Sequence, residues 1–348
     1  KPHSAQGDSP GGPAGKRLSV RHIARTPVPP AEIDPLGSGL YQVQVQANGR
    51  SLACQNISNG SSTRGKPVWD TMHEAFYAAW IEQLFDGDVN EDVSFPSLEP
   101  VLRDPERNFL HNALGLQEDK NLPATPDCAD FPYFLRSYFA WKNGLPFSYR
   151  YCNRGSATKP PTCDPVIINT DFVQKNAPPS TFRAASASVM NAVQSGNGRT
   201  ALASQETDLY PVPLDREVLW PGTVYADPYG HVLVLTKWVA QTDKSPGILF
   251  AVDAQPDNSI ARKRFWEGTF LFANIASAGP GFKGFRPVIN NRLLKNEELH
   301  DYSLDQAELT PDEFYAQMYS LINPEGLDAK QAYEATLTAL VEQLETRV

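Results

Sequence analysis

The chain has 348 residues, of which 41% are hydrophobic and 20% charged, and its formal net charge at pH 7 is −9. This composition is that of a globular protein with enough chain for one large domain or two small ones. The acidic balance argues against a nucleic-acid-binding protein, because a phosphate-binding surface needs clustered Lys and Arg and the basic cluster Arg262-Lys263-Arg264 is short. No stretch approaches the roughly 18 to 20 consecutive apolar residues of a membrane helix, so we expect no membrane span.

The first part of the chain is expected to lie outside the main domain. Residues 1–36 are rich in Pro, Gly and Ser, which predicts a flexible arm. They begin without an initiator Met or an apolar signal core, which is typical of a mature chain after removal of a signal peptide, so we expect a secreted or periplasmic protein. Apolar and polar residues then alternate on both sides of Asn48-Gly49, which predicts a β-hairpin over 37–62.

Helical periodicity begins with the main domain, which we place at 63–325. Apolar residues recur three and four positions apart over 68–85, as in an amphipathic helix. A second helical stretch covers roughly 98–115. A third runs from Cys128 to Asn143, with its apolar residues on one face.

The second half of the domain combines a helix, two strands and a helical tail. We expect a helix over 181–194, and two runs rich in β-branched and aromatic residues predict strands at 231–241 and 247–255. Thr310 followed by Pro311 and Glu313 predicts a helix start. A last helix within 326–348 should pack as a closing element through its apolar residues Tyr333, Leu337, Leu340, Val341 and Leu344.

The four cysteines indicate an oxidising compartment. Cys152 and Cys163 bracket a loop rich in Gly, Pro, Ser and Thr, which is typical of a short disulfide-closed surface loop. Cys54 and Cys128 are either bridged to each other or free. The sequence contains neither a C-x-x-C pair nor H-E-x-x-H, so it indicates no metal site and no cofactor.

Cys128 is the candidate nucleophile. It begins a strongly amphipathic helix, where unpaired backbone N–H groups and the helix dipole stabilise a thiolate, the reactive form of a cysteine. Asp127 and Asp130 oppose that effect, so the thiol needs an imidazolium partner. The alternative is a structural half-cystine bonded to Cys54.

His231 and Asp253 are the candidate partners of the thiol. His231 opens the first predicted strand just after a turn, and a histidine at a strand start can reach a thiol on a neighbouring helix and act as general base. Asp253 lies in the next, otherwise apolar strand, where a carboxylate needs a buried partner such as an imidazole N–H. Gln255 lies on the same strand face and is the alternative orienting residue.

These residues resemble a known group of enzymes. The segment that starts at Cys128 and ends in Gly144-Leu145-Pro146 resembles the nucleophile helix of transglutaminase-like and papain-like cysteine enzymes, and the order Cys, His, Asp matches as well. Gly230-His231-Val232 is similar to the NlpC-type cell-wall amidases. Val-Leu-Val follows His231, where the transglutaminase-like pattern usually has Ala-Trp.

The resemblance implies an α+β fold in which the nucleophile helix packs on an antiparallel sheet, with extra helices at both ends. It also implies a secreted cysteine peptidase, amidase or acyl transferase in which Cys128 attacks an amide carbonyl, His231 transfers the proton and Asp253 orients His231. Backbone N–H groups at the helix start would form part of the oxyanion hole. The expected substrate is a peptide, protein or cell-wall peptide, and the oligomeric state stays open. The alternative is a non-catalytic secreted binding or structural protein of the same fold.

Overall fold

The computed structural model describes residues 68–122, 124–173 and 177–345, together with the backbone of 39–47 and 50–59. The chain divides into two units, Lys1–Arg64 and Gly65–Val348. The described part of the first unit is the predicted hairpin. Its strands β1 (Gly39–Ala47) and β2 (Arg50–Asn59) pair antiparallel, with an irregular register between Val45 and Gln46. The predicted arm and the Asn48-Gly49 turn lie outside the described residues.

The second unit is built on a seven-stranded antiparallel sheet with helices on its faces, so the α+β class is confirmed. The strand order is β3-β10-β9-β8-β7-β11-β6. The sheet strands are β3 (Ser94–Phe95), β6 (Leu209–Pro211), β7 (Val224–Ala226), β8 (Val232–Val239), β9 (Ile248–Ala254), β10 (Ile260–Arg264) and β11 (Gly281–Phe285). The α-helices are α1 (Thr71–Leu84), α2 (Leu98–Arg103), α3 (Asp130–Asn143), α4 (Pro179–Ala192), α5 (Ser195–Gly198), α6 (Pro311–Ile322) and α7 (Ala329–Glu345). Two small hairpins pair β4 (Phe147–Tyr149) with β5 (Ile167–Asn169) and β12 (Val288–Ile289) with β13 (Arg292–Leu293).

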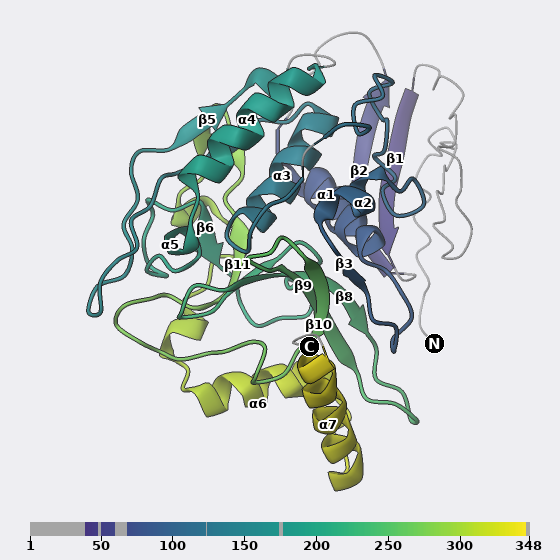
Figure 1. The fold of residues 1–348 in the computed structure, drawn as a ribbon, viewed down its shortest axis with the longest axis vertical. Helices are drawn as coiled ribbons and strands as arrows, with labels where there is room; N and C mark the ends of the chain where they lie inside the picture. Colours follow the sequence, from purple (N-terminus) through teal and green to yellow (C-terminus); the bar gives the residue numbers. More distant parts are fainter. Residues whose placement is uncertain (1–38, 48–49, 60–67, 123, 174–176, 346–348) are drawn as a thin grey trace, which may run out of the picture. The chain divides into compact units, whose positions relative to one another are not determined.

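The two faces of the sheet belong to two different apolar clusters. Val232 and Val234 of β8 lie in one cluster with α1, α3 and α4, whereas Leu233 and Leu235 lie in the other with α6. Because successive side chains of a strand point to opposite faces, this alternation means that the sheet is covered on both sides. Figure 1 shows the three layers, with α1, α3 and α4 on one side of the sheet and α6 on the other.

Helix α3 is buried around almost its whole circumference, whereas the sequence predicts one apolar face. The difference arises because its polar side chains have charged partners. Lys142 Nζ lies 2.5 Å from Glu118 Oε1 and 2.7 Å from Asp119 Oδ2, and all three side chains are fully buried. Nearer the start of the helix, Arg136 lies 2.5 Å from Glu74 of α1. These ion pairs let a helix with several polar residues lie in the middle of the unit.

The Gly-Leu-Pro sequence after α3 terminates the helix. Gly144 adopts a left-handed conformation with φ 65°, which glycine tolerates without steric cost. The N–H of Leu145 donates to Ala140 O at 2.8 Å, so the chain reverses in a glycine-dependent helix end. The carbonyl of Pro146 then accepts a hydrogen bond from Trp69 Nε1 at 2.7 Å, which ties the end of α3 to the segment before α1.

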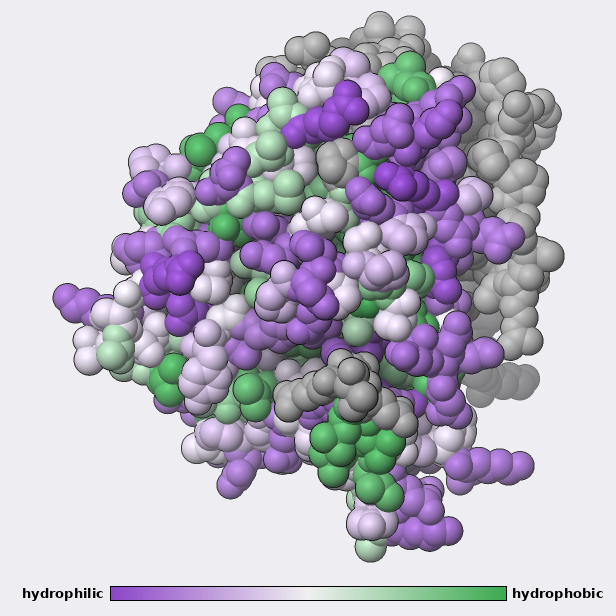
Figure 2. Space-filling view, viewed as in Figure 1, coloured by the Kyte–Doolittle hydropathy of each residue, from purple (hydrophilic) through white to green (hydrophobic). Residues whose placement is uncertain are grey.

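Two helices differ from their predictions. The stretch predicted at 98–115 is helical over 98–103, because Asp104 precedes Pro105 and has an extended conformation with φ −83° and ψ 111°. Helix α7 forms, but the apolar residues expected to pack are exposed, and Figure 2 shows a hydrophobic patch over this helix. The helix packs instead through Ala339, which is buried, and through an ion pair at 2.8 Å between Glu342 and Arg264 of β10. The exposed residues are Tyr333, Leu337, Leu340, Val341 and Leu344.

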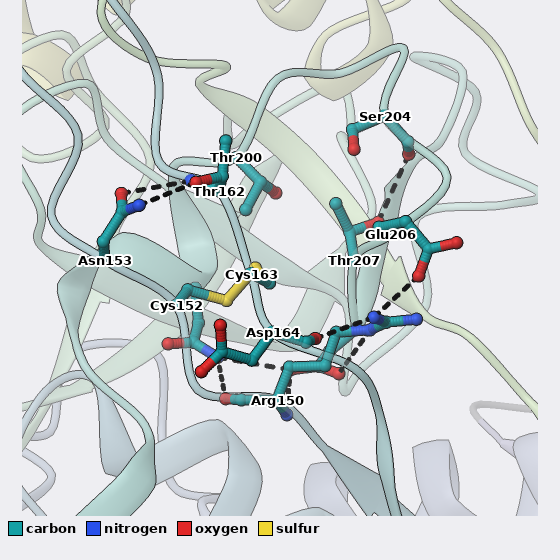
Figure 3. Close-up of a disulfide and its surroundings, with 12 residues drawn as sticks. Arg150, Cys152, Asn153, Thr162, Cys163, Asp164, Thr200, Ser204, Glu206 and Thr207 are labelled. Atoms are coloured by element: carbon teal, nitrogen blue, oxygen red, sulfur yellow. Dashed lines mark hydrogen bonds and ion pairs between the residues drawn. A yellow bond between two sulfur atoms is a disulfide. The ribbon is translucent and has the colours of Figure 1, made fainter.

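Cys152 and Cys163 form the predicted disulfide (Figure 3). Next to it, the N–H of Asn153 donates to Thr162 O at 2.9 Å, and its side-chain amide donates to Thr162 Oγ1 at 2.6 Å. Arg150 holds the other side of the loop with a hydrogen bond of 2.9 Å to the Asp164 carbonyl. A disulfide of this kind is compatible with an extracellular or periplasmic location.

Replacing Lys142 with Met should strongly destabilise the protein. The change leaves the carboxylates of Glu118 and Asp119 buried without their cation, so we expect the free energy of unfolding at pH 7 to fall by about 3–5 kcal/mol in urea denaturation. The matched control is Lys330→Met in α7, where the ion pair with Glu334 is solvent-exposed and 3.7 Å long. That change should cost less than about 0.5 kcal/mol, and equal losses in the two variants would contradict the role given to Lys142.

Candidate functional site

Cys128 lies in the turn that leads directly into α3. The structure has its thiol free and partly exposed, not in a disulfide. Cys54, the alternative bonding partner, lies in β2, where the structure describes only the backbone. Asp127 begins the turn, and its Oδ1 accepts hydrogen bonds from the N–H groups of Ala129 and Asp130 at 2.9 and 3.1 Å. The side chain of Asp127 therefore satisfies two N–H groups at the start of α3, and Cys128 is the first of the two residues between Asp127 and the helix.

His231, which directly precedes β8, lies beside Asp253 of the neighbouring antiparallel strand β9. Val234 of β8 pairs with Val252 of β9, and this register places His231, which precedes β8, diagonally across from Asp253 on the same face. His231 Nε2 lies 2.9 Å from Asp253 Oδ2. The imidazole is 32% exposed, whereas the carboxylate is 3% exposed. The imidazole of His231 is thus accessible to solvent, whereas the carboxylate of Asp253 is buried in the sheet.

Gln255 binds the carboxylate of Asp253. Its Nε2 donates to Asp253 Oδ2 at 2.6 Å, so this oxygen accepts hydrogen bonds from both Gln255 and His231. The sequence offers Asp253 and Gln255 as alternative orienting residues, and the structure arranges them in series. Gln255 orients the carboxylate, and the carboxylate orients the ring.

Contacts with Asp253 and Cys128 raise the pKa of His231. Burial alone lowers this pKa, but hydrogen bonds to Asp253 and to Cys128, together with the negative charges of those two groups, raise it to about 10. Since Nε2 faces Asp253, the other ring nitrogen, Nδ1, is the one available to the thiol. The structure therefore brings Cys128, His231 and Asp253 into one hydrogen-bonded chain.

Asp130, the first residue of α3, carries less negative charge near the thiol of Cys128 than an ordinary aspartate would. Burial and the charge of Asp127 raise the pKa of Asp130 to about 7. Near neutral pH this carboxyl group therefore carries its proton for much of the time. At pH 7 the acid on the helix side of Cys128 is therefore only partly ionised.

A cavity of about 960 Å³ opens beside His231. Its lining includes Asp227, Asp253 and Gln255 as well as His231, whereas Cys128 is not among the lining residues, so the cavity meets the site from the imidazole side. Asp253 Oδ1 is buried and has no hydrogen-bond partner among the described residues. The volume suits a ligand of small-molecule or short-peptide size.

Asp227 is a further residue at the site, and it does not belong to the predicted set. It begins the loop that joins β7 to β8 and ends at His231, and its side chain is buried. The sequence signal was present, because Asp227-Pro228 followed by Gly230 is typical of a tight turn. That signal predicts the turn but not the contact between the aspartate and the histidine that follows it.

Comparisons with protein-family models, with curated proteins and with solved structures found no match for this chain. Within the described residues, no group of three or more His, Cys, Asp or Glu side chains is arranged to hold a metal ion. The helices of the described part are all too short or too polar to cross a membrane. The geometry of Cys128, His231 and Asp253 is therefore the basis of the functional assignment.

The pKa of His231 can be measured directly by NMR titration of its ring. In the unmodified protein the ring should stay protonated up to a pH of about 10. Asp253→Asn removes the negative charge that stabilises the imidazolium, so the pKa should fall by at least about 1 unit. Gln255→Ala leaves that charge in place and should lower the pKa less. An ordinary pKa near 6.5 in the unmodified protein would contradict the hydrogen-bonded chain.

Asp130→Asn should stabilise the protein as the pH rises. The pKa of Asp130 is about 7 in the folded chain against its usual 3.8, so the contribution of this carboxyl group to stability is present below about pH 4 and is lost as the pH rises through 7. The variant cannot ionise, and above pH 7 its free energy of unfolding should exceed that of the unmodified protein by roughly 1–3 kcal/mol. Asp312→Asn, in the exposed first turn of α6, is the control and should bring no such gain. A difference that does not grow with pH would refute the assignment.

Proposed function

We propose that this protein is a cysteine-dependent amide hydrolase or acyl transferase with Cys128 as nucleophile, His231 as proton carrier and Asp253 as the residue that orients His231. The observation that carries the proposal is the chain of hydrogen bonds from Cys128 through His231 to Asp253. A nucleophile, a base and a group that orients the base, each within hydrogen-bond reach of the next, form the arrangement that activates a thiol in acyl transfer.

The residues act in two half-reactions. The thiolate of Cys128 attacks the amide carbonyl carbon, and the carbonyl electrons move to the oxygen as the C–S bond forms. The imidazolium of His231 then donates its proton to the leaving amine as the C–N bond breaks, which leaves a thioester on Cys128. Neutral His231 then takes a proton from water or from a second amine as that molecule attacks the thioester carbonyl. The C–S bond breaks, the acid or the new amide is released, and the thiolate of Cys128 and the imidazolium of His231 are restored.

Asp253 keeps the ring of His231 in the productive orientation during both steps. With Nε2–H donated to the carboxylate, Nδ1 is the ring nitrogen left to exchange a proton with the sulfur. A pKa of about 10 means that His231 is protonated at neutral pH, so it is ready to act as the acid that the first step needs. Turnover should therefore decline only as the pH rises toward 10.

The oxyanion of the intermediate needs hydrogen-bond donors. Asp127 already engages the N–H groups of Ala129 and Asp130, so these two are not the donors that the sequence suggests. Among the N–H groups at the start of α3, we assign the role to the N–H of Cys128. A donor on the nucleophile's own residue lies close to the carbonyl oxygen after attack.

The proposed core fold and substrate class rest on the resemblance of the sequence to known cysteine enzymes. The Cys helix followed by a His strand is similar to the transglutaminase-like, papain-like and NlpC-type enzymes, which supports a papain-like core around α3 and β8. The size of the cavity beside His231 suits a short peptide segment, whether it belongs to a free peptide, a protein or a cell wall. The disulfide supports a secreted or periplasmic location.

The reactivity of Cys128 toward iodoacetamide tests this function without knowledge of the substrate. At pH 7, alkylation of Cys128, followed by peptide mass spectrometry, should be at least about 10-fold faster than that of an ordinary exposed cysteine. His231→Ala should remove this advantage, because it removes the cation beside the sulfur. The control is His300→Ala, since His300 also pairs with an aspartate, Asp301, at 2.6 Å, but on the surface. Slow alkylation in the unmodified protein, or equal rates in the two variants, would reject the proposed function.

A further inference from the structure

We propose that Asp227 is the positioning residue of His231, which it fixes through the backbone of the loop between β7 and β8. This inference rests on the proposed function. The loop consists of residues 227–231, because Ala226 of β7 pairs with Val232 of β8. Since His231 is the last residue of that loop, whatever fixes the loop also fixes the start of the imidazole side chain.

The side chain of Asp227 holds the second half of the loop. Its Oδ1 accepts three hydrogen bonds, from the N–H groups of Tyr229, Gly230 and His231, at 2.7, 2.6 and 2.9 Å. The main chain adds a fourth contact, since the N–H of Asp227 donates to His231 O at 2.9 Å. His231 is therefore bound to Asp227 through both its N–H and its carbonyl. Hydrogen bonds to an ionised carboxylate are about twice as strong as neutral ones.

Burial makes these contacts decisive for the loop. Asp227 is 4% exposed, its hydrogen bond with Gly230 is buried, and those with Tyr229 and His231 are partly buried, so its carboxylate is the main acceptor near these N–H groups. Without the carboxylate, the loop would have to rearrange to satisfy them. The imidazole at the end of the loop would then move relative to Cys128 and Asp253.

The outer side of the same loop is fixed by close packing. Gly230 has φ +117°, a conformation that side chains disfavour, and a Cβ at this position would lie 3.0 Å from Cβ of Ser195 in α5. Residues 229–231 of the loop thus lie between α5 on one side and the carboxylate of Asp227 on the other. These contacts restrict the loop to one backbone conformation, which fixes the position of His231.

The position of Asp227 also separates it from the residues that touch the reacting atoms. Its hydrogen bonds go to the backbone, whereas Asp253 binds the ring itself. Other charged groups line the same cavity, among them Asp92, Asp257 and Lys263. A test must therefore separate the hydrogen bonds of Asp227 to the loop backbone from the electrostatic effect of a negative charge near His231.

Three variants of the full chain make this distinction, with iodoacetamide alkylation of Cys128 at pH 7 as the readout. Asp227→Ala removes the acceptor and should slow alkylation by about 10- to 100-fold, the scale expected when a catalytic group is displaced by about 1 Å. Asp227→Asn keeps the Oδ1 acceptor but not the charge and should restore most of the rate. Asp257→Ala, which removes an aspartate from a turn on the same cavity where it binds the N–H of Ser259 at 3.0 Å, should leave the rate unchanged.

A double-mutant cycle shows whether Asp227 acts through His231. In a His231→Ala background, Asp227→Ala should change the alkylation rate by less than about twofold, because the group that it positions is gone. Near-UV circular dichroism checks that each variant is folded. The inference is overturned if Asp227→Asn is as slow as Asp227→Ala, if Asp257→Ala is equally slow, or if Asp227→Ala has its full effect without His231.

The same data separate the two proposals. If Cys128 of the unmodified protein reacts no faster than an ordinary cysteine, and His231→Ala does not change the rate, the proposed function fails and Asp227 has nothing to position. If His231→Ala slows alkylation while Asp227→Ala does not, the function stands and the role of Asp227 is refuted.

Discussion

A carboxylate buried in an apolar strand determines the position and the protonation state of the histidine beside it. Asp253 lies within β9, where a charge without partners would be costly, and the structure satisfies its Oδ2 with the ring of His231 and the amide of Gln255. The contact with His231 fixes the ring and keeps it protonated near neutral pH. The protonated ring is the cation that the proposed function requires beside the thiol of Cys128.

The fold brings together groups that are far apart along the chain. The segment before α3 supplies the thiol, the loop between β7 and β8 supplies the imidazole, and β9 supplies the carboxylate. Helix α3 lies against the face of the sheet to which Val232 and Val234 contribute, and a buried ion pair of Lys142 with Glu118 joins it to the loop between α2 and α3. The site therefore depends on contacts well outside it, since a shift of α3 would move Cys128 away from His231.

Local sequence signals predict much of this structure. The capping box that begins at Thr310 starts α6 as expected, and the run of β-branched and aromatic residues at 231–241 forms β8. Contacts between distant segments are not predictable in this way. The burial of Lys142 depends on carboxylates 23 and 24 positions away in the chain. The hydrogen bond between Asp227 and His231 joins residues that are close in the sequence. Its relevance to the site depends on the contact of His231 with Asp253, which is distant in the sequence. The apolar face of α7 predicts a helix, yet the helix packs through Ala339, because amphipathic spacing cannot say which surface a helix meets.

Acylation of Cys128 is the most direct test that this protein transfers acyl groups through a thiol. The protein, mixed with excess p-nitrophenyl acetate at pH 7, should release a rapid burst of about one equivalent of nitrophenolate, as expected for an acyl-enzyme that accumulates. Peptide mass spectrometry of the quenched sample should place the acetyl group on Cys128, and Cys128→Ala should give no burst. A burst of the same size in Cys128→Ala, or acetylation confined to other residues, would contradict the assignment of Cys128 as the nucleophile.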